Sequence, residues 1–354
     1  MMKKLLLYFT PFNGMPQVVF LLMLLMLSVR VSAQQLTACR DSVKDGYDFW
    51  LYTPQNNDTM PELKPLVMFL HGQSLCGKNL SKVLQYGTID ALTKGRRIDA
   101  IVVAPQTQGP WKPARLNNIY EWVKTRYPVD TNRFYVLGMS LGGYGTLDFT
   151  ASYPDKIAAA VAMCGGATVN DLCGLNIVPL RIVHGTADKA VPVGCSDRVV
   201  AEMADCGDTS RLVYDRLPKI NHSQLARLFY MDSTYDWLFA HSLTDSLRTI
   251  NNHCVISAAT MKTSYANLDT HYKLKVIDKK PVKMQGKNNN KAASDHNQPV
   301  VDDDDSEAVY YVIKKGDTLS AIASRNKTTV DKLCKLNRMN KSAVLQIGRK
   351  IRIK

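Results

Sequence analysis

Between residues 34 and 258 the chain alternates nearly all-apolar runs with amphipathic segments. The apolar runs are short and end in turn residues, as strands do; they span residues 48–54, 65–72, 100–106, 133–138, 180–185 and 211–218. Residues 116–127 and 196–206 instead repeat their apolar positions at helical spacing. Short apolar strands separated by helices predict an α/β fold, in which helices cover both faces of a mostly parallel sheet.

The pattern changes after residue 258. Residues 259–308 contain an asparagine run, an aspartate run and few large apolar residues, which predicts a solvated flexible linker. Residues 309–354 then show two strand patterns around two short helical ones. Thr318 and Thr329 stand where helix caps are expected, so this segment is predicted to be a compact βααβ unit.

The first 33 residues have the pattern of an export signal. Lys3 and Lys4 precede an apolar run at 18–29, which is shorter than the roughly 20 residues that a membrane-spanning helix needs. Small residues before position 34 predict cleavage after Ala33, which leaves an exported chain without a transmembrane segment: periplasmic, on the cell surface or secreted. An uncleaved anchor is one alternative. Lipidation of Cys39 is another, because residues 36–39 resemble a lipobox.

The formal net charge of +14 is concentrated near the C-terminus. Residues 34–258 carry 22 Lys/Arg and 21 Asp/Glu, a net charge of +1. Residues 309–354 carry 12 Lys/Arg and 2 Asp/Glu, a net charge of +10. Such a basic unit can bind nucleic acid or an anionic surface. No aromatic-rich strand or recognition motif accompanies the charge, so we expect no nucleic-acid partner.

Eight cysteines lie in the predicted mature chain. Export permits disulfides, and two pairs are close enough in sequence to close short loops: Cys164 with Cys173, and Cys195 with Cys206. The sequence does not determine the connectivity, and buried free cysteines are the alternative. No Cys/His spacing resembles a zinc site, and we expect no metal and no organic cofactor.

A serine in the stretch 133–150 has the setting of a nucleophile elbow. A strand pattern leads into Gly138-Met139-Ser140-Leu141-Gly142, and a helical pattern follows. Glycines allow the close backbone approach of such a turn, on which the serine adopts strained dihedral angles. In this context Ser140 is predicted to be a nucleophile.

A nucleophilic serine needs a base, and the base needs an orienting acid. In this architecture the acid and then the histidine follow the serine along the chain. Asp188 and His222 each come just after a predicted strand, so both fall with Ser140 at the carboxyl edge of the sheet. The remaining candidates are expected to serve structure: His184, Asp197, Asp215, His241 and His253.

The developing oxyanion needs two backbone donors. We expect them to be the amide of Leu141, directly after the nucleophile, and the amide of Gln73, in the loop after the strand at 65–72. His71 is expected to brace that loop. A simple tight turn at this position is the alternative.

Residues 48–241 resemble an α/β-hydrolase of the polyhydroxybutyrate depolymerase and feruloyl-esterase-like group, also labelled predicted peptidases. The matching stretches are PLVMFLHG, VVAPQTQGPW, residues 129–166 around Ser140, HGTADKAVPV and residues 221–241. The resemblance implies ester hydrolysis. The sequence differs from that group after LHG: a glycine-rich loop is common there in the group, whereas this chain has QSLCGKN at residues 73–79. Trp111 in QGPW is a candidate for lining the substrate cleft, with core packing as the alternative.

Residues 309–354 resemble a LysM domain. YYVIKKGDTLSAIA matches the opening half of the family, and LCKLN with VLQIGRKIRIK matches the closing half. The resemblance implies binding of N-acetylglucosamine-containing glycans, such as peptidoglycan, in a groove between two loops. The predicted contacts are Gly316, Asp317, Thr318 and Leu319 in one loop and Val344, Leu345, Gln346 and Ile347 in the other. Helix capping and core packing are the alternative roles.

The sequence therefore predicts an exported carboxylesterase that acts on acyl, acetyl or feruloyl esters and is tethered to cell-wall glycan by its LysM domain. One alternative is a serine peptidase of the same fold. The other is a glycan-binding protein whose hydrolase domain is inactive, although the intact serine, aspartate and histidine in the correct order argue against it.

Overall fold

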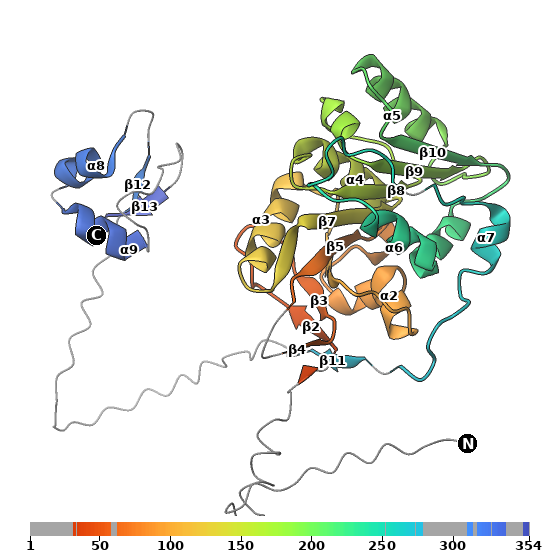
Figure 1. Ribbon diagram of the computed structural model, residues 1–354, viewed down its shortest axis with the longest axis horizontal. Helices are drawn as coiled ribbons and strands as arrows, with labels where there is room; N and C mark the ends of the chain where they lie inside the picture. Colours follow the sequence, from red (N-terminus) through yellow and green to blue (C-terminus); the bar gives the residue numbers. More distant parts are fainter. Residues whose placement is uncertain are drawn as a thin grey trace, which may run out of the picture. The chain divides into compact units, whose positions relative to one another are not determined.

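The structure is a computed structural model of the chain. It describes residues 31–32, 34–57, 62–251, 253–272, 274–278, 310–313, 317–326, 328–337 and 350–353. The chain divides into two compact units, Met1–Lys283 and Met284–Lys354 (Figure 1). Most of the predicted export signal lies outside the described residues. Within them, no helix has the length and apolar character needed to cross a membrane.

Nine strands form one sheet in the described part of the first unit, in the order β10-β9-β8-β7-β5-β6-β3-β2-β11. Their bounds are β2 (Gln35–Cys39), β3 (Phe49–Thr53), β5 (Lys64–Leu70), β6 (Ile101–Pro105), β7 (Val129–Met139), β8 (Ala159–Met163), β9 (Leu180–Gly185), β10 (Leu212–Leu217) and β11 (Lys275–Ile277). The strands from β10 to β6 run parallel, and β3 is antiparallel to both of its neighbours. The predicted α/β fold is confirmed. A separate short pair joins β1 (Val31–Ser32) to β4 (Asn56–Asn57).

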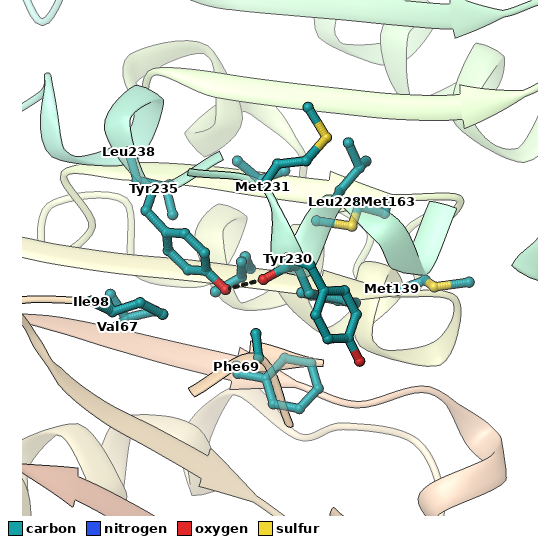
Figure 2. Close-up of a cluster of buried hydrophobic side chains, with 14 of the residues drawn as sticks. Val67, Phe69, Ile98, Met139, Met163, Leu228, Tyr230, Met231, Tyr235 and Leu238 are labelled. Carbon is teal, nitrogen blue, oxygen red and sulfur yellow. Dashed lines mark hydrogen bonds between the residues drawn. The ribbon is translucent and has the colours of Figure 1, made fainter. Parts of the chain in front are cut away.

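Alternate residues of the central strands face two apolar cores, one on each side of the sheet. In β5, Val67 and Phe69 belong to the first core, whereas Met68 and Leu70 belong to the second. Figure 2 shows part of the first core, where Phe69 lies near Tyr230 and Tyr235. This alternation explains why the strand is apolar at every position.

Helical segments cover both cores, as the sequence predicts. The first core packs against η2 (Leu80–Leu84), α2 (Thr88–Thr93), η4 (Ser223–Tyr230) and α6 (Asp232–Phe239). The second packs against α3 (Pro113–Lys124), α4 (Leu141–Ser152), η3 (Cys173–Ile177) and α5 (Gly194–Asp205). The loops after β5, β7, β8, β9 and β10 all leave the same edge of the sheet, because these strands are parallel.

The first unit continues past the domain boundary that the sequence predicts at residue 258. α7 (Ala258–Lys262) begins with a capping box at Ser257, and Met261 is buried. The edge strand β11 then pairs with β2. The linker interpretation is therefore wrong for residues 259–278, and the rest of the predicted linker lies outside the described residues.

Polar contacts also hold this segment. The buried guanidinium of Arg96 donates hydrogen bonds to the carbonyl oxygens of Ser264 at 3.2 Å and Ala266 at 3.0 Å. The guanidinium of Arg97 lies 4.2 Å from the centre of the Tyr272 ring. Such contacts leave no apolar periodicity in the sequence, which explains why the pattern of residues 259–278 does not predict this part of the fold.

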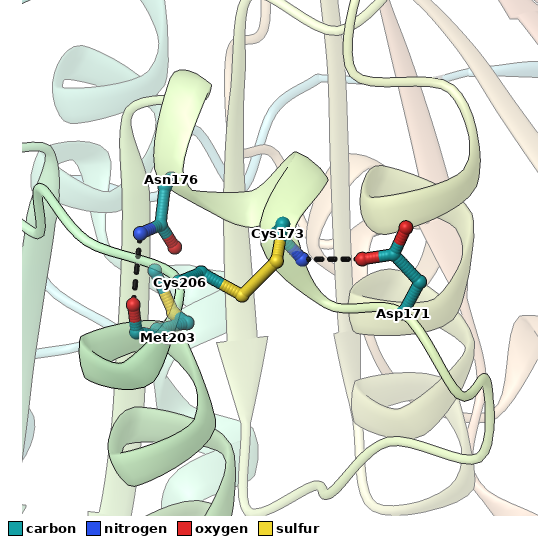
Figure 3. Close-up of a disulfide and its surroundings, with 5 residues drawn as sticks. All are labelled: Asp171, Cys173, Asn176, Met203 and Cys206. Atoms are coloured by element: carbon teal, nitrogen blue, oxygen red, sulfur yellow. Dashed lines mark hydrogen bonds between the residues drawn. A yellow bond between two sulfur atoms is a disulfide. The ribbon is translucent and has the colours of Figure 1, made fainter.

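A disulfide joins Cys173, at the start of η3, to Cys206, at the end of α5 (Figure 3). It takes one cysteine from each of the two pairs that sequence proximity suggests, so both of those pairings are wrong. Cys195 and Cys206 lie near opposite ends of α5, about 16 Å apart along its axis, which a disulfide cannot span. Cys164 instead follows β8 and is fully buried.

The second unit has the predicted βααβ order. β12 (Tyr310–Val312) pairs antiparallel with β13 (Lys350–Arg352), and α8 (Leu319–Arg325) and α9 (Val330–Asn337) lie between them in the sequence. Both expected helix caps are present: the Thr318 hydroxyl accepts from the Ala321 N–H at 3.2 Å, and the Thr329 hydroxyl accepts from the Lys332 N–H at 3.2 Å. Residues of both helices and of β13 form a small apolar core.

Candidate active site

Ser140 occupies a strained turn between β7 and α4. Its backbone angles are φ 60° and ψ −122°, outside the regions that side-chain-bearing residues prefer. Its N–H donates to the Met163 carbonyl at 2.9 Å, and its carbonyl accepts from the Tyr144 N–H at 3.0 Å. Strain of this kind costs on the order of 1–3 kcal/mol and persists where the surrounding structure enforces it.

Two glycines make the turn possible. A Cβ on Gly138 would lie 2.4 Å from the Gly142 carbonyl oxygen, and a Cβ on Gly142 would lie 1.9 Å from the Leu70 carbonyl oxygen. Both distances are far below ordinary contact, so α4 can approach β7 and β5 this closely only without side chains. The strand–turn–helix arrangement expected around Ser140 is present.

Asp188 and His222 come together at the same edge of the sheet. Asp188 follows β9, and its fully buried carboxylate accepts from the His222 Nδ1–H at 2.7 Å. The other carboxylate oxygen accepts from the N–H groups of Ala190 and Val191, both at 2.9 Å. His222 immediately precedes η4, as its N-cap residue, and is partly exposed. Because Nδ1 faces Asp188, Nε2 is the ring nitrogen left to take a proton.

The loop after β5 lies against Ser140. A Cβ on Gly72 would lie 3.5 Å from the Ser140 Cβ, and the Gly72 N–H donates to the Tyr86 hydroxyl at 2.9 Å. Gln73 follows as the first residue of η1 (Gln73–Leu75), and Leu141 is the first residue of α4. An N–H at the start of a helix has no partner within the helix, so both amides are available to an oxyanion.

His71 braces this loop as a neutral side chain. Its Nδ1–H donates to the Gly72 carbonyl at 2.7 Å, and its Nε2 accepts from the Thr107 N–H at 3.2 Å. Burial lowers the pKa of His71 to about 4, which agrees with a single ring proton. Tyr86 supports the same loop, and no pattern in the sequence indicates this role.

Trp111 has the packing role that the sequence analysis left as the alternative. Only 5% of its surface is exposed. Its Nε1–H donates to the His71 carbonyl at 3.3 Å, and its ring lies edge-on to the rings of His71 and Tyr47. These contacts agree with core packing, and a contact of Trp111 with substrate stays a prediction.

Asp215 and Asp197 are held in structural contacts. Asp215 pairs with Arg181 at 2.6 Å, and Asp197 accepts from Tyr214 at 2.7 Å. His241 is buried, and His253 is exposed. His184 is buried and lies 3.6 Å from the Asp188 carboxylate, which the sequence does not indicate.

A sulfur atom also approaches the Asp188–His222 pair. The Cys164 Sγ, an Asp188 carboxylate oxygen and a ring nitrogen of His222 all lie within 4.8 Å of one another. Within the described residues this is the one such group of possible metal ligands. The carboxylate and the ring also form the 2.7 Å hydrogen bond described above.

A half-open cavity of about 500 Å³ lies beside the loop that His71 braces. Its lining is polar and includes Lys78, Gln106, Thr107 and Arg115. The Thr107 carbonyl accepts from the Gly77 N–H at 3.0 Å, so the cavity wall is continuous with the loop that carries Gln73. The cavity offers amide and charged groups to a ligand.

In the second unit, the three described members of the predicted glycan loop have structural contacts. The Asp317 carboxylate accepts from the Tyr311 hydroxyl at 2.8 Å and from Arg325 at 2.9 Å. Thr318 caps α8, and Leu319 is buried. These contacts correspond to the alternative roles that the sequence left open. Gly316, Val344, Leu345, Gln346 and Ile347 lie outside the described residues.

Comparison with known proteins identifies the second unit. Residues 311–354 match the family model of the LysM domain. The predicted LysM domain is therefore confirmed. Over 156 residues, 41% of this chain, the sequence is 29% identical to a bifunctional acetylxylan esterase/xylanase of Neocallimastix patriciarum. The matched stretch spans 22% of that relative's length.

Solved structures of esterases and a related hydrolase are similar to the chain. A thermostable esterase aligns with a TM-score of 0.47 and 23% identity, covering 59% of this chain and 63% of that one. The feruloyl esterase module from Clostridium thermocellum aligns with a TM-score of 0.45 and 14% identity, covering 63% of this chain and 92% of that one. An S-formylglutathione hydrolase from Staphylococcus aureus aligns with a TM-score of 0.43 and 14% identity, covering 59% of this chain and 98% of that one.

Proposed function

We propose that the first unit is a serine ester hydrolase with Ser140 as nucleophile, His222 as base and Asp188 as orienting acid. The observation that carries the proposal is the strained Ser140 turn at the sheet edge where Asp188 and His222 are hydrogen-bonded. A serine hydroxyl needs such a base to react at neutral pH. The stretch of sequence shared with an acetylxylan esterase supports an ester as the substrate.

In this mechanism, the Ser140 Oγ attacks the ester carbonyl carbon while His222 Nε2 accepts the hydroxyl proton. Asp188 stabilises the resulting imidazolium. The amides of Leu141 and Gln73 donate to the oxyanion of the tetrahedral intermediate, which collapses to an acyl-serine. The leaving alcohol takes the proton from His222. Water, activated by the same histidine, then releases the acid and restores Ser140.

The surroundings favour a hydrophilic ester. The polar cavity adjoins the loop that carries Gln73, and its amide and charged groups suit a hydroxylated alcohol better than a lipid chain. We further propose that the protein is exported, as the N-terminal pattern and the Cys173–Cys206 disulfide suggest. The LysM domain would then hold the enzyme on N-acetylglucosamine-containing glycan.

The test is hydrolysis of 4-nitrophenyl acetate, 4-nitrophenyl butyrate and a feruloyl ester by a protein of residues 34–354, beside its Ser140→Ala variant. We expect the variant to lose about a thousandfold or more in kcat/KM. Ser210→Ala is the matched control, because Ser210 is exposed and precedes β10, away from the edge that holds Ser140.

Three outcomes would contradict the proposal. Equal hydrolysis by wild type and Ser140→Ala would exclude Ser140 as the nucleophile. Cleavage of peptides, with no turnover of any ester, would show a peptidase instead. If the folded protein hydrolyses neither class while binding peptidoglycan, the hydrolase unit is inactive.

A further inference from the structure

We infer that Cys164 is a positioning residue for the proposed active site: its thiol donates a hydrogen bond to the Asp188 carboxylate and holds it for His222. This inference rests on the function proposed above. It concerns a buried side chain that the proposed mechanism does not use.

Cys164 and Ser140 occupy equivalent places on neighbouring strands. Met139 of β7 pairs with Met163 of β8, so the residue that follows each methionine stands at the same edge of the sheet. Both residues have a left-handed backbone, with φ 60° for Ser140 and φ 38° for Cys164. A residue with a Cβ is strained there, whereas glycine would not be. The fold thus keeps a side chain at a position where its backbone is costly.

The thiol lies beside the acid and the base. Cys164 is fully buried, and its Sγ, an Asp188 carboxylate oxygen and a His222 ring nitrogen all lie within 4.8 Å of one another. Burial, and then the negative charge of Asp188, raise the pKa of the Cys164 thiol far above its usual range. The sulfur therefore keeps its proton at neutral pH. Beside a carboxylate, which only accepts, a protonated thiol is the donor.

The Asp188 carboxylate has room for this donor. One oxygen accepts the N–H groups of Ala190 and Val191, and the other accepts from His222. A carboxylate has about four acceptor positions, so one remains. The other titratable group that faces it is His184, whose Nε2 lies 3.6 Å away but 2.9 Å from the Val191 carbonyl. Burial lowers the pKa of His184, which gives it one ring proton, directed to Val191.

Loss of the thiol should change both geometry and charge. Without the fourth donor, the Asp188 carboxylate can turn away from His222, which slows the proton transfer and lowers kcat. The Asp188 carboxylate also has one hydrogen-bond donor fewer, so its negative charge stabilises the imidazolium of His222 more strongly. The acidic limb of the kcat/KM profile then moves to higher pH.

The experiment compares Cys164→Ala, Cys164→Ser and the control Cys39→Ala in the protein of residues 34–354. Cys39 is also buried, but it lies in β2, away from β8. We expect Cys164→Ala to lose about tenfold in kcat at nearly constant KM, with its acidic limb moved upward. Cys164→Ser restores a donor, so its kcat should return to within about threefold of wild type. Cys39→Ala should match wild type.

Three results would overturn the inference. The first is a Cys164→Ala variant with wild-type kcat and an unmoved acidic limb. The second is a serine variant that is slower than the alanine variant, which indicates that the thiol only fills apolar space. If Cys164→Ala does not fold, the test rests on Cys164→Ser. A hydroxyl is a stronger hydrogen-bond donor than a thiol, so the acidic limb of the Cys164→Ser profile should move to lower pH. An unmoved acidic limb in this variant is the third contrary result.

The Ser140→Ala and Asp188→Asn variants, measured in parallel, separate this inference from the proposed function. If neither lowers esterase activity, the proposed function is wrong, and the role of Cys164 is wrong with it. If both abolish activity while Cys164→Ala has no effect, the function stands and only the positioning role is excluded.

Discussion

Gly142 has no space for a side chain, so a substitution there tests whether the turn at Ser140 depends on this close approach. Its Cβ would lie 1.9 Å from the Leu70 carbonyl oxygen, so Gly142→Ala must push α4 away from β5. We expect this variant to lose about 2–4 kcal/mol of unfolding free energy and at least about a hundredfold in esterase kcat/KM. Urea unfolding and the nitrophenyl ester assay measure the two effects.

Gly194→Ala is the matched control for that variant. Gly194 also lies in the first turn of a helix, but a Cβ there meets no atom within 4 Å and its backbone is unstrained. We expect this variant to be as stable and as active as wild type. A fully active Gly142→Ala protein would show that the Ser140 turn does not depend on this close approach.

His71 gives a prediction about pH. Its folded pKa of about 4 lies below the ordinary value of 6.5, so the unfolded chain binds more protons than the folded one between these values. Stability is therefore full above about pH 6.5 and falls as the pH decreases toward 4, by on the order of 3 kcal/mol from this group. His71→Asn should be less stable at pH 7 but lose less on acidification. Urea unfolding at pH 7, 5.5 and 4.5 tests this.

The exposed His253 supplies the control, since His253→Asn should leave the pH dependence as in wild type. Burial also lowers the pKa of His184 and His241, so part of the acid sensitivity will remain in the His71 variant. Wild type and His71→Asn with identical slopes would show that His71 is not buried in its neutral form.

At the residue scale, the sequence predicts those features that local backbone rules determine. The spacing of Gly138, Ser140 and Gly142 dictates a turn, and the chain order places Asp188 and His222 after it. Trp111 and Cys164 could not be assigned in this way. The exposure of an indole and the partner of a thiol depend on which distant segments pack beside them, and a single sequence does not give that packing.

At the element scale, the end of the first unit can be tested by truncation. A protein of residues 34–258 lacks α7 and β11, whereas one of residues 34–283 keeps both. The shorter protein exposes the apolar surface under Met261 and removes two carbonyl acceptors from the buried Arg96. We expect it to be less stable by about 3–5 kcal/mol, as measured by urea unfolding. Equal midpoints would restore the boundary at residue 258.

The elements that the sequence missed share a physical cause. β8 is alanine-rich, and alanine favours helices, so its pattern did not indicate a strand although every residue is buried. β11 is an edge strand with exposed positions and no apolar run. By contrast, the sequence predicts the strongly apolar β9 with the observed bounds, and β5 and β6 with errors of one or two residues at their ends. Strength of local pattern, rather than importance in the sheet, decided which elements were found.

At the scale of the whole molecule, the two units divide the chemistry between them. The described residues that form the candidate active site all belong to the first unit, whereas residues 309–354 hold a net charge of +10. The uneven charge distribution could be derived from the sequence alone, because charge is a property of composition.

The division predicts that removal of residues 284–354 separates binding from catalysis. The shortened protein, residues 34–283, should hydrolyse soluble nitrophenyl esters within about twofold of the full rate, because its active site is intact. It should no longer sediment with insoluble peptidoglycan. Sedimentation of the longer protein should weaken between about 0.05 and 0.5 M NaCl, since salt screens the attraction of its basic unit to an anionic polymer.

Uncharged chitin is the control polymer for this experiment. If the LysM domain contributes specific glycan contacts, the longer protein should sediment with chitin and do so nearly independently of salt. Binding to peptidoglycan alone, lost completely at high salt, would mean that the basic charge is the whole of the interaction. Retention of the shortened protein on either polymer would place the glycan site in the hydrolase unit and contradict the proposed tether.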